Sequence, residues 1–345
     1  MNKICIKDLS VPELEEALRQ AKGESYRAKQ ILRWLYRTPV QAIEEMKDLP
    51  ADLRRSLDEK FRVSGLETAD MRRSVMDGTT KYLFMLEDGN MIETVLLLEK
   101  ARNTVCLSSQ VGCKYSCAFC ASAALGFIRN LTQSEILDQV ISIRCANPSM
   151  NITNLVFMGI GEPFDNYDNV MRAIRIFNDK NAFNIGARKI TVSTCGVVPG
   201  IEKLKKERLQ IELSVSLHSA DDGIRSKLLP VNSRYPLSML MKACRDYIKE
   251  TNRIVTFEYV LIKGVNSSKD DAMKLSTLLK GMKCKVNAIS YNKIPGSPYE
   301  EPSEKEVGLF MKVLEAHKVN AMHRKPKGDD IDAGCGQLRI SRMKK

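Results

Sequence analysis

Residues 104–129 read TVCLSSQVGCKYSCAFCASAALGFIR and contain three closely spaced cysteines, Cys113, Cys117 and Cys120. The C-x3-C-x2-C spacing lets one short loop turn three thiolates toward a common point. A structural zinc ion normally takes four protein ligands, whereas a [4Fe-4S] cluster held by three thiolates leaves one iron open to another ligand. With the cysteine content of this chain, the spacing arises by chance roughly once in a hundred such sequences. The stretch therefore predicts an iron–sulfur site.

The same stretch resembles the signature of radical S-adenosylmethionine (SAM) enzymes, in which an aromatic residue, here Phe119, precedes the last cysteine. Four neighbouring runs are similar to those of the RlmN/Cfr family of RNA adenine methyltransferases. They are SSQVGC before the cluster cysteines, GFIRNLT after them, FMGIGEP at 157–163 and IDAGCGQLR at 331–339. The resemblance covers nearly the whole chain and is nearer to RlmN than to Cfr.

Composition describes a globular protein, with 43% hydrophobic and 28% charged residues in 345 positions. This length allows one large domain with an appendage, or two domains. No apolar run approaches the roughly 20 residues of a membrane helix, and the N-terminal sequence has no signal-peptide core, so we expect a cytoplasmic protein without membrane contact. Ten cysteines then favour metal or redox chemistry over a disulfide framework. The net charge of +12 favours a polyanionic partner without establishing one.

Residues 1–75 are predicted to form a small helical domain. Ser10 is a candidate cap for its first helix, and a second amphipathic helix follows. Lys29, Arg33 and Arg37 recur every four residues and line one face of that second helix. This face is either an ordinary solvated surface or a surface that contacts RNA phosphates.

Residues 76–103 are predicted to form a β-hairpin extension that turns at Asp88, Gly89 and Asn90. Glu93 lies in the second strand of this hairpin, among apolar neighbours. A lone glutamate in a strand usually faces solvent, so the pattern by itself gives Glu93 no function.

Residues 104–295 alternate six short apolar strands with five helices, which predicts an α/β fold with parallel strands and right-handed crossovers. Six strands are too few to close an eight-stranded barrel, so we expect a partial barrel, and the resemblance implies a (β/α)6 radical SAM core. The expected strands are 104–108, 154–159, 188–194, 211–217, 254–262 and 285–291. The expected helices are 133–146, 167–179, 198–207, 236–250 and 268–280.

Polar residues follow several of these strands, at the edge where parallel (β/α) folds gather their chemistry. They are Gly161 and Glu162, Ser193, Ser216 and His218, and Asn292. The resemblance implies that these positions and Leu217 bind SAM. The Gly161 and Glu162 turn offers a carboxylate to the ammonium group of SAM. His218 could equally be an ordinary buried, hydrogen-bonded residue.

The tail, residues 296–345, is predicted to contain a helix over 303–317 and a short strand over 320–325. Cys335 follows between Gly334 and Gly336, a setting that permits close approach of a substrate and differs from that of a buried inert cysteine. The resemblance implies that Cys335 takes a methyl group from one SAM molecule and becomes an S-methylcysteine.

The remaining steps are also implied by the resemblance. A second SAM yields a 5′-deoxyadenosyl radical, which abstracts hydrogen from the S-methyl group, and the methylene radical adds to the adenine ring. Cys106 then attacks the sulfur of Cys335, releasing the RNA and forming a transient disulfide. Glu93 is a candidate acceptor for the ring proton, and Cys106 is the alternative.

The resemblance further implies methylation of adenine C2 in 23S rRNA and in tRNA just 3′ of the anticodon, by a monomer that receives electrons from a flavodoxin or ferredoxin. Two alternatives remain. One is C8 methylation of 23S rRNA, as in Cfr, and the other is an iron–sulfur RNA-binding or electron-transfer protein without methyl transfer.

Overall fold

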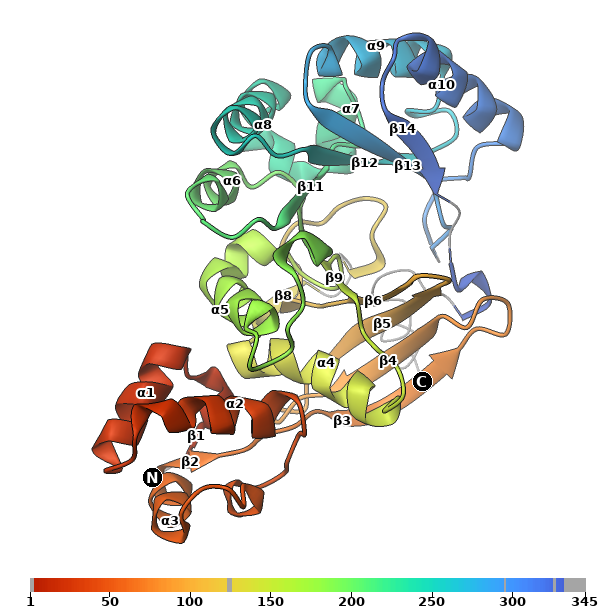
Figure 1. Ribbon diagram of the computed structural model, residues 1–345. Coiled ribbons are helices and arrows are strands. Elements are labelled where there is room, and N and C mark those ends of the chain that lie inside the picture. The colour runs from red at the N-terminus through yellow and green to blue at the C-terminus, as the bar shows by residue number, and fades with distance from the viewer. Residues whose placement is uncertain (1–2, 123–125, 295, 325–326, 332–345) are drawn as a thin grey trace.

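The computed structural model describes residues 3–122, 126–294, 296–324 and 327–331 (Figure 1). A curved ten-stranded sheet runs through most of it, with β14 at one edge and β3 at the other. The strand order is β14, β13, β12, β11, β10, β9, β6, β5, β4 and β3. Neighbouring strands in this order are hydrogen-bonded, so the barrel-like core and the hairpin extension share a single sheet.

Seven consecutive strands of this sheet are parallel, which confirms the α/β class and the partial barrel. They are β6 (Arg102–Cys106), β9 (Asn154–Phe157), β10 (Ile190–Thr194), β11 (Glu212–Ser216), β12 (Val255–Leu261), β13 (Cys284–Ser290) and β14 (Ala321–Arg324). The first six overlap the predicted stretches, although β6 begins and ends two residues before the predicted 104–108. The short strand expected in the tail is β14, and it continues the parallel sheet beside β13.

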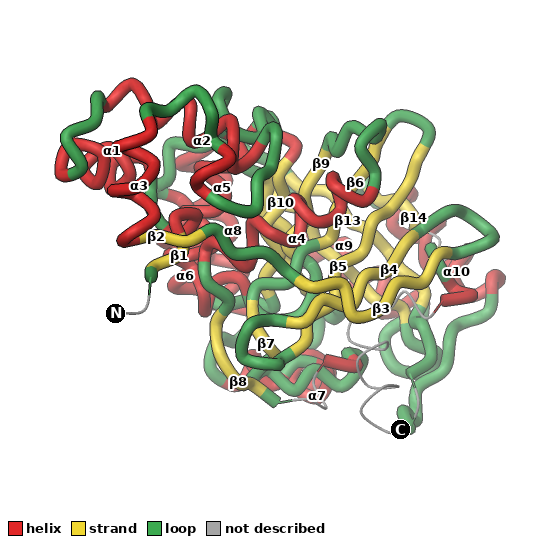
Figure 2. Tube along the Cα trace, turned by 90° about the horizontal axis from the view of Figure 1, so that it is seen from below, coloured by secondary structure: helices red, strands yellow, loops and turns green. Residues whose placement is uncertain are grey.

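Three antiparallel strands extend the sheet from β6 (Figure 2). They are β5 (Met91–Glu99), β4 (Thr80–Met85) and β3 (Glu67–Arg73). The predicted hairpin is formed by β4 and β5, which turn at Gly89 with a φ of +79°. By contrast, β3 lies in the stretch expected to be helical. Its side chains are mostly exposed at the sheet edge, so it lacks the alternation of apolar and polar residues that marks a half-buried strand.

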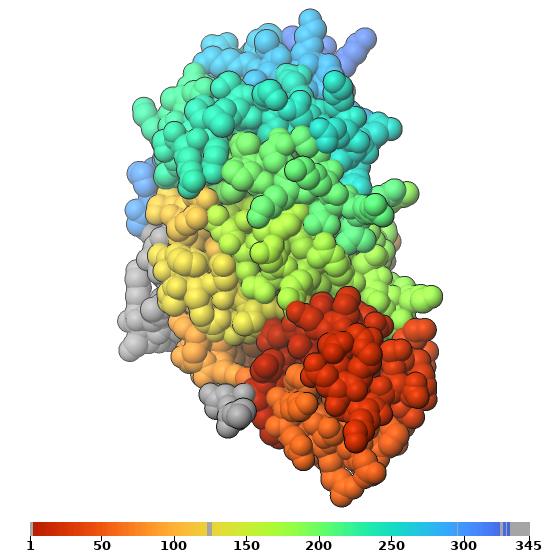
Figure 3. Space-filling model, turned by 90° about the vertical axis from the view of Figure 1, so that its left-hand side faces the viewer, coloured from red at the N-terminus to blue at the C-terminus, as the bar shows by residue number. Residues whose placement is uncertain are grey.

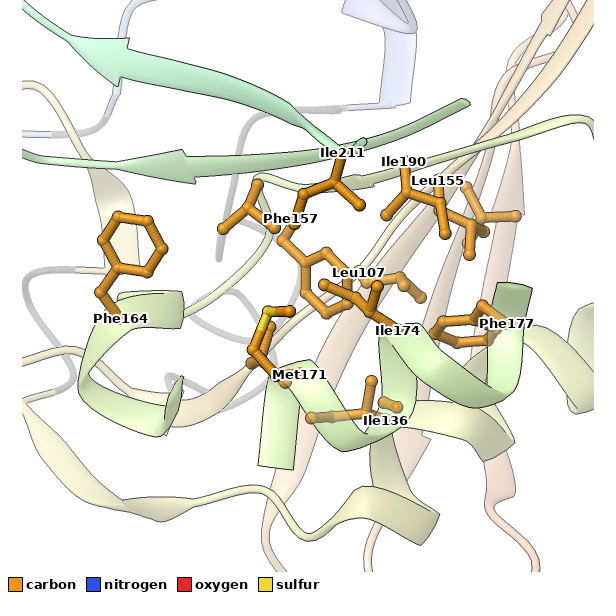
Figure 4. Close-up of a cluster of buried hydrophobic side chains, with 14 of the residues drawn as sticks. Leu107, Ile136, Leu155, Phe157, Phe164, Met171, Ile174, Phe177, Ile190 and Ile211 are labelled. Atoms are coloured by element: carbon orange, nitrogen blue, oxygen red, sulfur yellow. The ribbon is translucent and has the colours of Figure 1, made fainter. Parts of the chain in front are cut away.

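The helices that join the parallel strands pack against the outer face of the sheet (Figure 1). They are α4 (Gln133–Ala146), α5 (Tyr167–Asn178), α6 (Val198–Lys205), α7 (Asp222–Leu228), α8 (Leu237–Thr251), α9 (Lys269–Leu279) and α10 (Glu304–Ala316). Figure 4 shows the core between them, where Leu155 and Ile190 of the strands meet Ile174 and Phe177 of α5. Of these helices, only the short α7 was not predicted.

The N-terminal domain contains α1 (Val11–Gln20), α2 (Ala28–Tyr36) and α3 (Ala51–Lys60), with a two-residue parallel ladder of β1 (Ile4–Cys5) and β2 (Phe61–Arg62). Ser10 caps α1 as predicted, because its hydroxyl accepts a hydrogen bond from Glu13 N–H while the Glu13 carboxylate accepts one from Ser10 N–H. The domain covers one end of the molecule, in red and orange in Figure 3.

Buried polar contacts fix this domain to the barrel helices. The Lys7 ammonium forms an ion pair with Asp138 of α4, and both side chains are about 3% exposed. At the end of α2, the Arg37 guanidinium donates to the carbonyl oxygens of Lys180 and Ala182. Lys29, Arg33 and Arg37 are all exposed, but Arg37 is also engaged within the protein through these two carbonyl oxygens. No helix among the described residues is long and apolar enough to cross a membrane.

Candidate active site

A cavity of about 310 Å³ opens at the carboxyl ends of the parallel strands. Its wall includes nine of the residues that the sequence singled out. They are Cys113, Cys117, Cys120, Gly161, Glu162, Ser193, Ser216, His218 and Asn292. Residues from distant parts of the chain thus meet in one place because the ends of parallel strands share one edge of the sheet.

Leu217 is the exception among the predicted cofactor-binding positions. Its side chain is fully buried in the core and does not line the cavity. Its N–H donates to the Glu258 carbonyl oxygen at 3.0 Å, and its own carbonyl accepts from Arg225 Nε at 3.2 Å. Both backbone groups of Leu217 therefore hold the end of β11 in place.

The cysteine loop, residues 113–120, is presented by a small antiparallel ladder of β7 (Gln110–Gly112) and β8 (Phe127–Asn130). Gly112 has a φ of +73°, and a Cβ atom there would lie 1.7 Å from the Gly126 carbonyl oxygen. Only glycine fits this crossing, which starts the loop. Farther along the loop, Ala118 N–H donates to the Leu228 carbonyl oxygen of α7 at 3.0 Å.

Burial raises the pKa of the Cys113 thiol to about 12 and raises that of Cys117 well above its usual value. A nearby metal charge reverses this effect, because thiolates are the form that binds metal. Among the described residues, no group of three His, Cys, Asp or Glu side chains is arranged to hold a single metal ion. Three thiolates around an iron–sulfur cluster each bind a different iron, and Cys113, Cys117 and Cys120, which all line the cavity, supply three such ligands.

Gly161 and Glu162 form a tight turn on the cavity wall. Gly161 has a φ of +101°, and a Cβ atom there would lie 2.5 Å from Gln110 Cβ. The buried Glu162 carboxylate accepts hydrogen bonds from Phe164 N–H at 3.0 Å and Cys195 N–H at 2.8 Å. Burial raises its pKa to about 7. The side chains of Thr194 and Cys195 also hydrogen-bond to this carboxylate, so its roughly four acceptor positions are occupied and a cationic ligand would interact with Glu162 mainly through its charge.

His218 is 2% exposed and has a φ of +55°. Its Nδ1 accepts a hydrogen bond from Val260 N–H at 3.0 Å, which assigns the proton to Nε2. Burial, and then the Arg225 charge, lower its pKa to about 3, so the ring is neutral. The edge of Phe119 packs against it, with ring centroids 4.5 Å apart. Nε2 has no protein partner within the described chain, so this cavity-lining residue offers a hydrogen-bond donor to a ligand.

Glu258 of β12 is a cavity residue that sequence reasoning did not identify. Its Oε1 accepts from Ser214 Oγ at 2.8 Å and from Asn287 Nδ2 at 2.9 Å. The sequence feature that could have pointed to Glu258 is its position as a carboxylate inside the strongly apolar run 254–262. The run could not reveal its partners, because these lie on β11 and β13.

Cys106 lies at the end of β6 and faces the same side of the sheet as the cavity. Cys106 pairs with Val156 of β9, and Val156 pairs with Thr191 of β10. Thr191 is two residues before Ser193, which lines the cavity. Paired residues point to the same face, and side chains two apart return to that face. The Cys106 sulfur also accepts from the backbone N–H of Met158, another cavity residue.

Glu93 and Lys81 lie on the same face beside Cys106. Val95 pairs with Cys106 on one side and with Lys81 on the other, and Glu93 is two residues from Val95. Glu93 is 3% exposed and Lys81 is fully buried, so Glu93 does not face solvent as a lone strand glutamate usually does. Burial raises the pKa of Cys106 to about 12; the Lys81 charge opposes this rise and the Glu93 charge adds to it. Cys335 lies outside the described residues.

Two family models match the chain. Residues 107–275 match the radical SAM superfamily. Residues 4–63 match the ribosomal RNA large subunit methyltransferase N-terminal domain. The two matches cover most of the barrel and the helical domain that docks against it.

Individual proteins are similar over almost the full length. A protein of Thermoanaerobacter sp. (strain X514), named probable dual-specificity RNA methyltransferase RlmN, is 44% identical over 339 residues, covering 98% of each chain. A protein of the same name from Clostridioides difficile (strain 630) is 44% identical over 337 residues, again covering 98% of each. The crystal structure of a radical SAM methyltransferase from Sphaerobacter thermophilus matches with a TM-score of 0.91 and 44% identity, covering 97% of this chain and 98% of that one.

Proposed function

The chain belongs to the RlmN family of radical SAM RNA methyltransferases, and from this membership we propose that it methylates C2 of adenine in both 23S rRNA and tRNA. The name "dual-specificity" of its relatives supports two RNA classes. The tRNA target is the adenine just 3′ of the anticodon. The net charge of +12 suits either polyanion.

In this proposal the cavity holds the two cofactors. Cys113, Cys117 and Cys120 bind three irons of a [4Fe-4S] cluster, and SAM occupies the space beside them. When bound, the cluster and SAM supply electron transfer, radical chemistry and the methyl group. Glu162 binds the SAM ammonium group, and the neutral His218 donates from Nε2 to an acceptor on the adenosine. Ser193, Ser216 and Asn292 provide hydrogen bonds to its hydroxyl and carboxylate groups.

Three further residues act on the RNA. The sulfur of Cys335 carries the methyl carbon to the adenine as a thioether. Glu93 accepts the proton that leaves C2. The Cys106 thiolate then attacks the Cys335 sulfur and a disulfide bond forms. The bond between that sulfur and the transferred carbon breaks, its electron pair stays with the carbon, and the carbon takes up a proton to become the methyl group. Lys81 supports this role, since its charge favours the Cys106 thiolate.

One observation carries the proposal: a single cavity gathers the cysteine loop and polar residues at the carboxyl ends of β9, β10, β11 and β13, with Cys106 and Glu93 on the same face of the sheet. Simple electron-transfer proteins need no such cavity beside their cluster. We also propose that the enzyme acts as a cytoplasmic monomer and receives its electrons from a flavodoxin or ferredoxin.

Nucleoside mass spectrometry of rRNA and tRNA tests the function. The RNA comes from a host that lacks its own enzyme, with and without this chain expressed. We expect 2-methyladenosine in both RNA classes and none with the Cys335→Ala variant. Finding 8-methyladenosine would move the reaction to C8. No methylated adenosine, from protein with an intact cluster, would instead favour an iron–sulfur RNA-binding or electron-transfer protein.

A further inference from the structure

A second hollow, which we call the outer cleft, adjoins the cysteine loop at Tyr115. Its volume is about 220 Å³. Tyr115, between Cys113 and Cys117 in the sequence, lines both the cavity and the outer cleft. The residues on the wall of the outer cleft are Tyr115, Phe164, Asp165, Val197, Pro199, Gly200, Lys203, Arg234 and Tyr235.

The floor of the outer cleft is apolar and closely packed. Phe164 lies against Gly200, where an added Cβ atom would come within 2.3 Å of the Phe164 ring. Glycine at this position lets the start of α6 approach the turn after β9. Tyr235, 8% exposed, forms another part of the wall.

The rim of the outer cleft is cationic. Lys203 and Arg234 are exposed, and each lies over a tyrosine ring: Lys203 Nζ is 5.3 Å from the centroid of Tyr167, and the Arg234 guanidinium is 5.3 Å from that of Tyr235. Asp165 is the acidic residue of the wall, and its Oδ2 lies 2.9 Å from Lys114 Nζ. Lys114 thus offsets the one negative charge, and Lys203 and Arg234 leave the outer cleft positive.

We propose that the outer cleft docks the negatively charged electron-carrier protein that reduces the cluster. This inference rests on the proposed function, because it requires a cluster at Cys113, Cys117 and Cys120. A carrier seated there contacts Tyr115, which lies between Cys113 and Cys117 in the sequence and also lines the cavity. The carrier gives up one electron and becomes oxidised, and the cluster gains that electron.

The charge of the outer cleft suits a transient partner. Electron-transfer encounters commonly bury less than about 1,200 Å² in total, and opposite charges speed such encounters without requiring tight binding. An RNA chain would also be attracted to Lys203 and Arg234. However, the adenine must enter the cavity, and among the described residues Tyr115 alone lines both the cavity and the outer cleft, so we favour the carrier protein.

Charge reversal at the rim tests the proposal. The variant is Lys203→Glu/Arg234→Glu, and the control is Lys280→Glu/Lys312→Glu, which makes the same charge change at exposed positions after α9 and on α10. Reduction of the cluster is followed by stopped-flow absorbance with reduced flavodoxin and, separately, with dithionite. Binding of oxidised flavodoxin to each purified protein is measured by fluorescence anisotropy.

We expect the rim variant to be reduced by flavodoxin at least tenfold more slowly at low salt and to bind it correspondingly more weakly. The difference should shrink at high salt, and the rate with dithionite should not change. An equal loss in the control, an equal loss with dithionite, or no loss at all would overturn the proposal. So would a variant that loses RNA affinity but keeps its flavodoxin rate, since the outer cleft would then be an RNA contact. If flavodoxin docks and reduces the wild type but no RNA is methylated, only the proposed function fails.

Discussion

At the scale of single residues, Gly161 and Gly89 illustrate two different reasons why a position in the chain requires glycine. Both have positive φ, +101° and +79°, but a Cβ atom would meet Gln110 within 2.5 Å at Gly161 and nothing within 4 Å at Gly89. We expect Gly89→Ala to cost about 1–2 kcal/mol of unfolding free energy from the backbone alone. Gly161→Ala should cost about 1–3 kcal/mol more, from crowding against β7. Urea unfolding of both variants measures the difference, and equal costs would mean that Gln110 moves away freely.

Gly161→Ala should also weaken SAM binding, because the turn that carries Glu162 must shift. Titration calorimetry with SAM measures this, and Gly89→Ala serves as the matched control. An unchanged dissociation constant for Gly161→Ala would show that this turn does not contact SAM.

His218 should make stability fall in acid. Its folded pKa is lowered to about 3, while in the unfolded chain the ring takes up a proton below about pH 6.5. Between these two pKa values the unfolded state therefore binds more protons than the folded state. The free energy of unfolding contributed by the neutral ring is fully present above pH 6.5 and falls as the pH falls, by up to about 1.4 kcal/mol per pH unit. Unfolding free energies of the wild type and His218→Phe between pH 4.5 and 7 should show a shallower slope for the variant. His317→Phe, at the exposed end of α10, is the control, and equal slopes for His218→Phe and the wild type would contradict the neutral ring.

Residues in local motifs were predictable from the sequence, and residues defined by strand pairing were not. The cysteine loop and the Gly161 and Glu162 turn are contiguous runs, so their positions could be read directly. Lys81 and Glu258 owe their positions to register with neighbouring strands, which no single stretch of sequence reveals.

At the scale of elements, the buried ion pair of Lys7 and Asp138 joins the N-terminal domain to α4. Burial raises the pKa of Asp138 to about 6, against the effect of Lys7. We expect Lys7→Met to cost about 3–5 kcal/mol, because it leaves a buried carboxylate without its cation. The double variant Lys7→Met/Asp138→Leu should recover much of that loss, since an apolar pair of similar volume needs no hydration.

A double-mutant cycle by urea unfolding tests this pair. The exposed pair Lys242 and Asp246 on α8 is the control, with an expected coupling of about 0.3–0.5 kcal/mol. Additive losses at Lys7 and Asp138 would mean that the two charges do not depend on each other.

Elements with regular apolar patterns were predicted well, and two elements without such a pattern, β3 and α7, were missed. The six strands and five helices of the core have buried faces that repeat along the sequence. In contrast, β3 has four charged residues among seven, and α7 is a seven-residue helix with only two buried positions. Their structure depends on neighbours that the local pattern does not identify.

At the scale of the whole molecule, one of the three basic residues predicted on one face of α2 also holds the N-terminal domain against the barrel. The triplet Lys29, Arg33 and Arg37 was predicted as a possible RNA face, but Arg37 binds backbone carbonyls near the end of α5. We therefore expect Lys29→Ala/Arg33→Ala to weaken RNA binding and to reduce the slope of log affinity against log salt by about 1.4–1.8, if each contacts one phosphate.

Arg37→Ala should instead lower the unfolding free energy and leave this slope unchanged. Filter binding of RNA over a salt series, together with urea unfolding, distinguishes the two variants. An unchanged slope for Lys29→Ala/Arg33→Ala would mean that this face of α2 is simply solvated.

The sheet does not close on itself, and its two edges have a consequence for behaviour at high concentration. An open strand edge can pair with the same edge of another copy, which is a route to aggregation. Within the described part of the chain, β14 offers four residues at one edge, and the other edge is β3, which carries Glu67, Asp70, Arg72 and Arg73. One edge is thus too short and the other too charged to pair with a strand of another copy. The barrel can therefore remain open to its substrate without promoting aggregation.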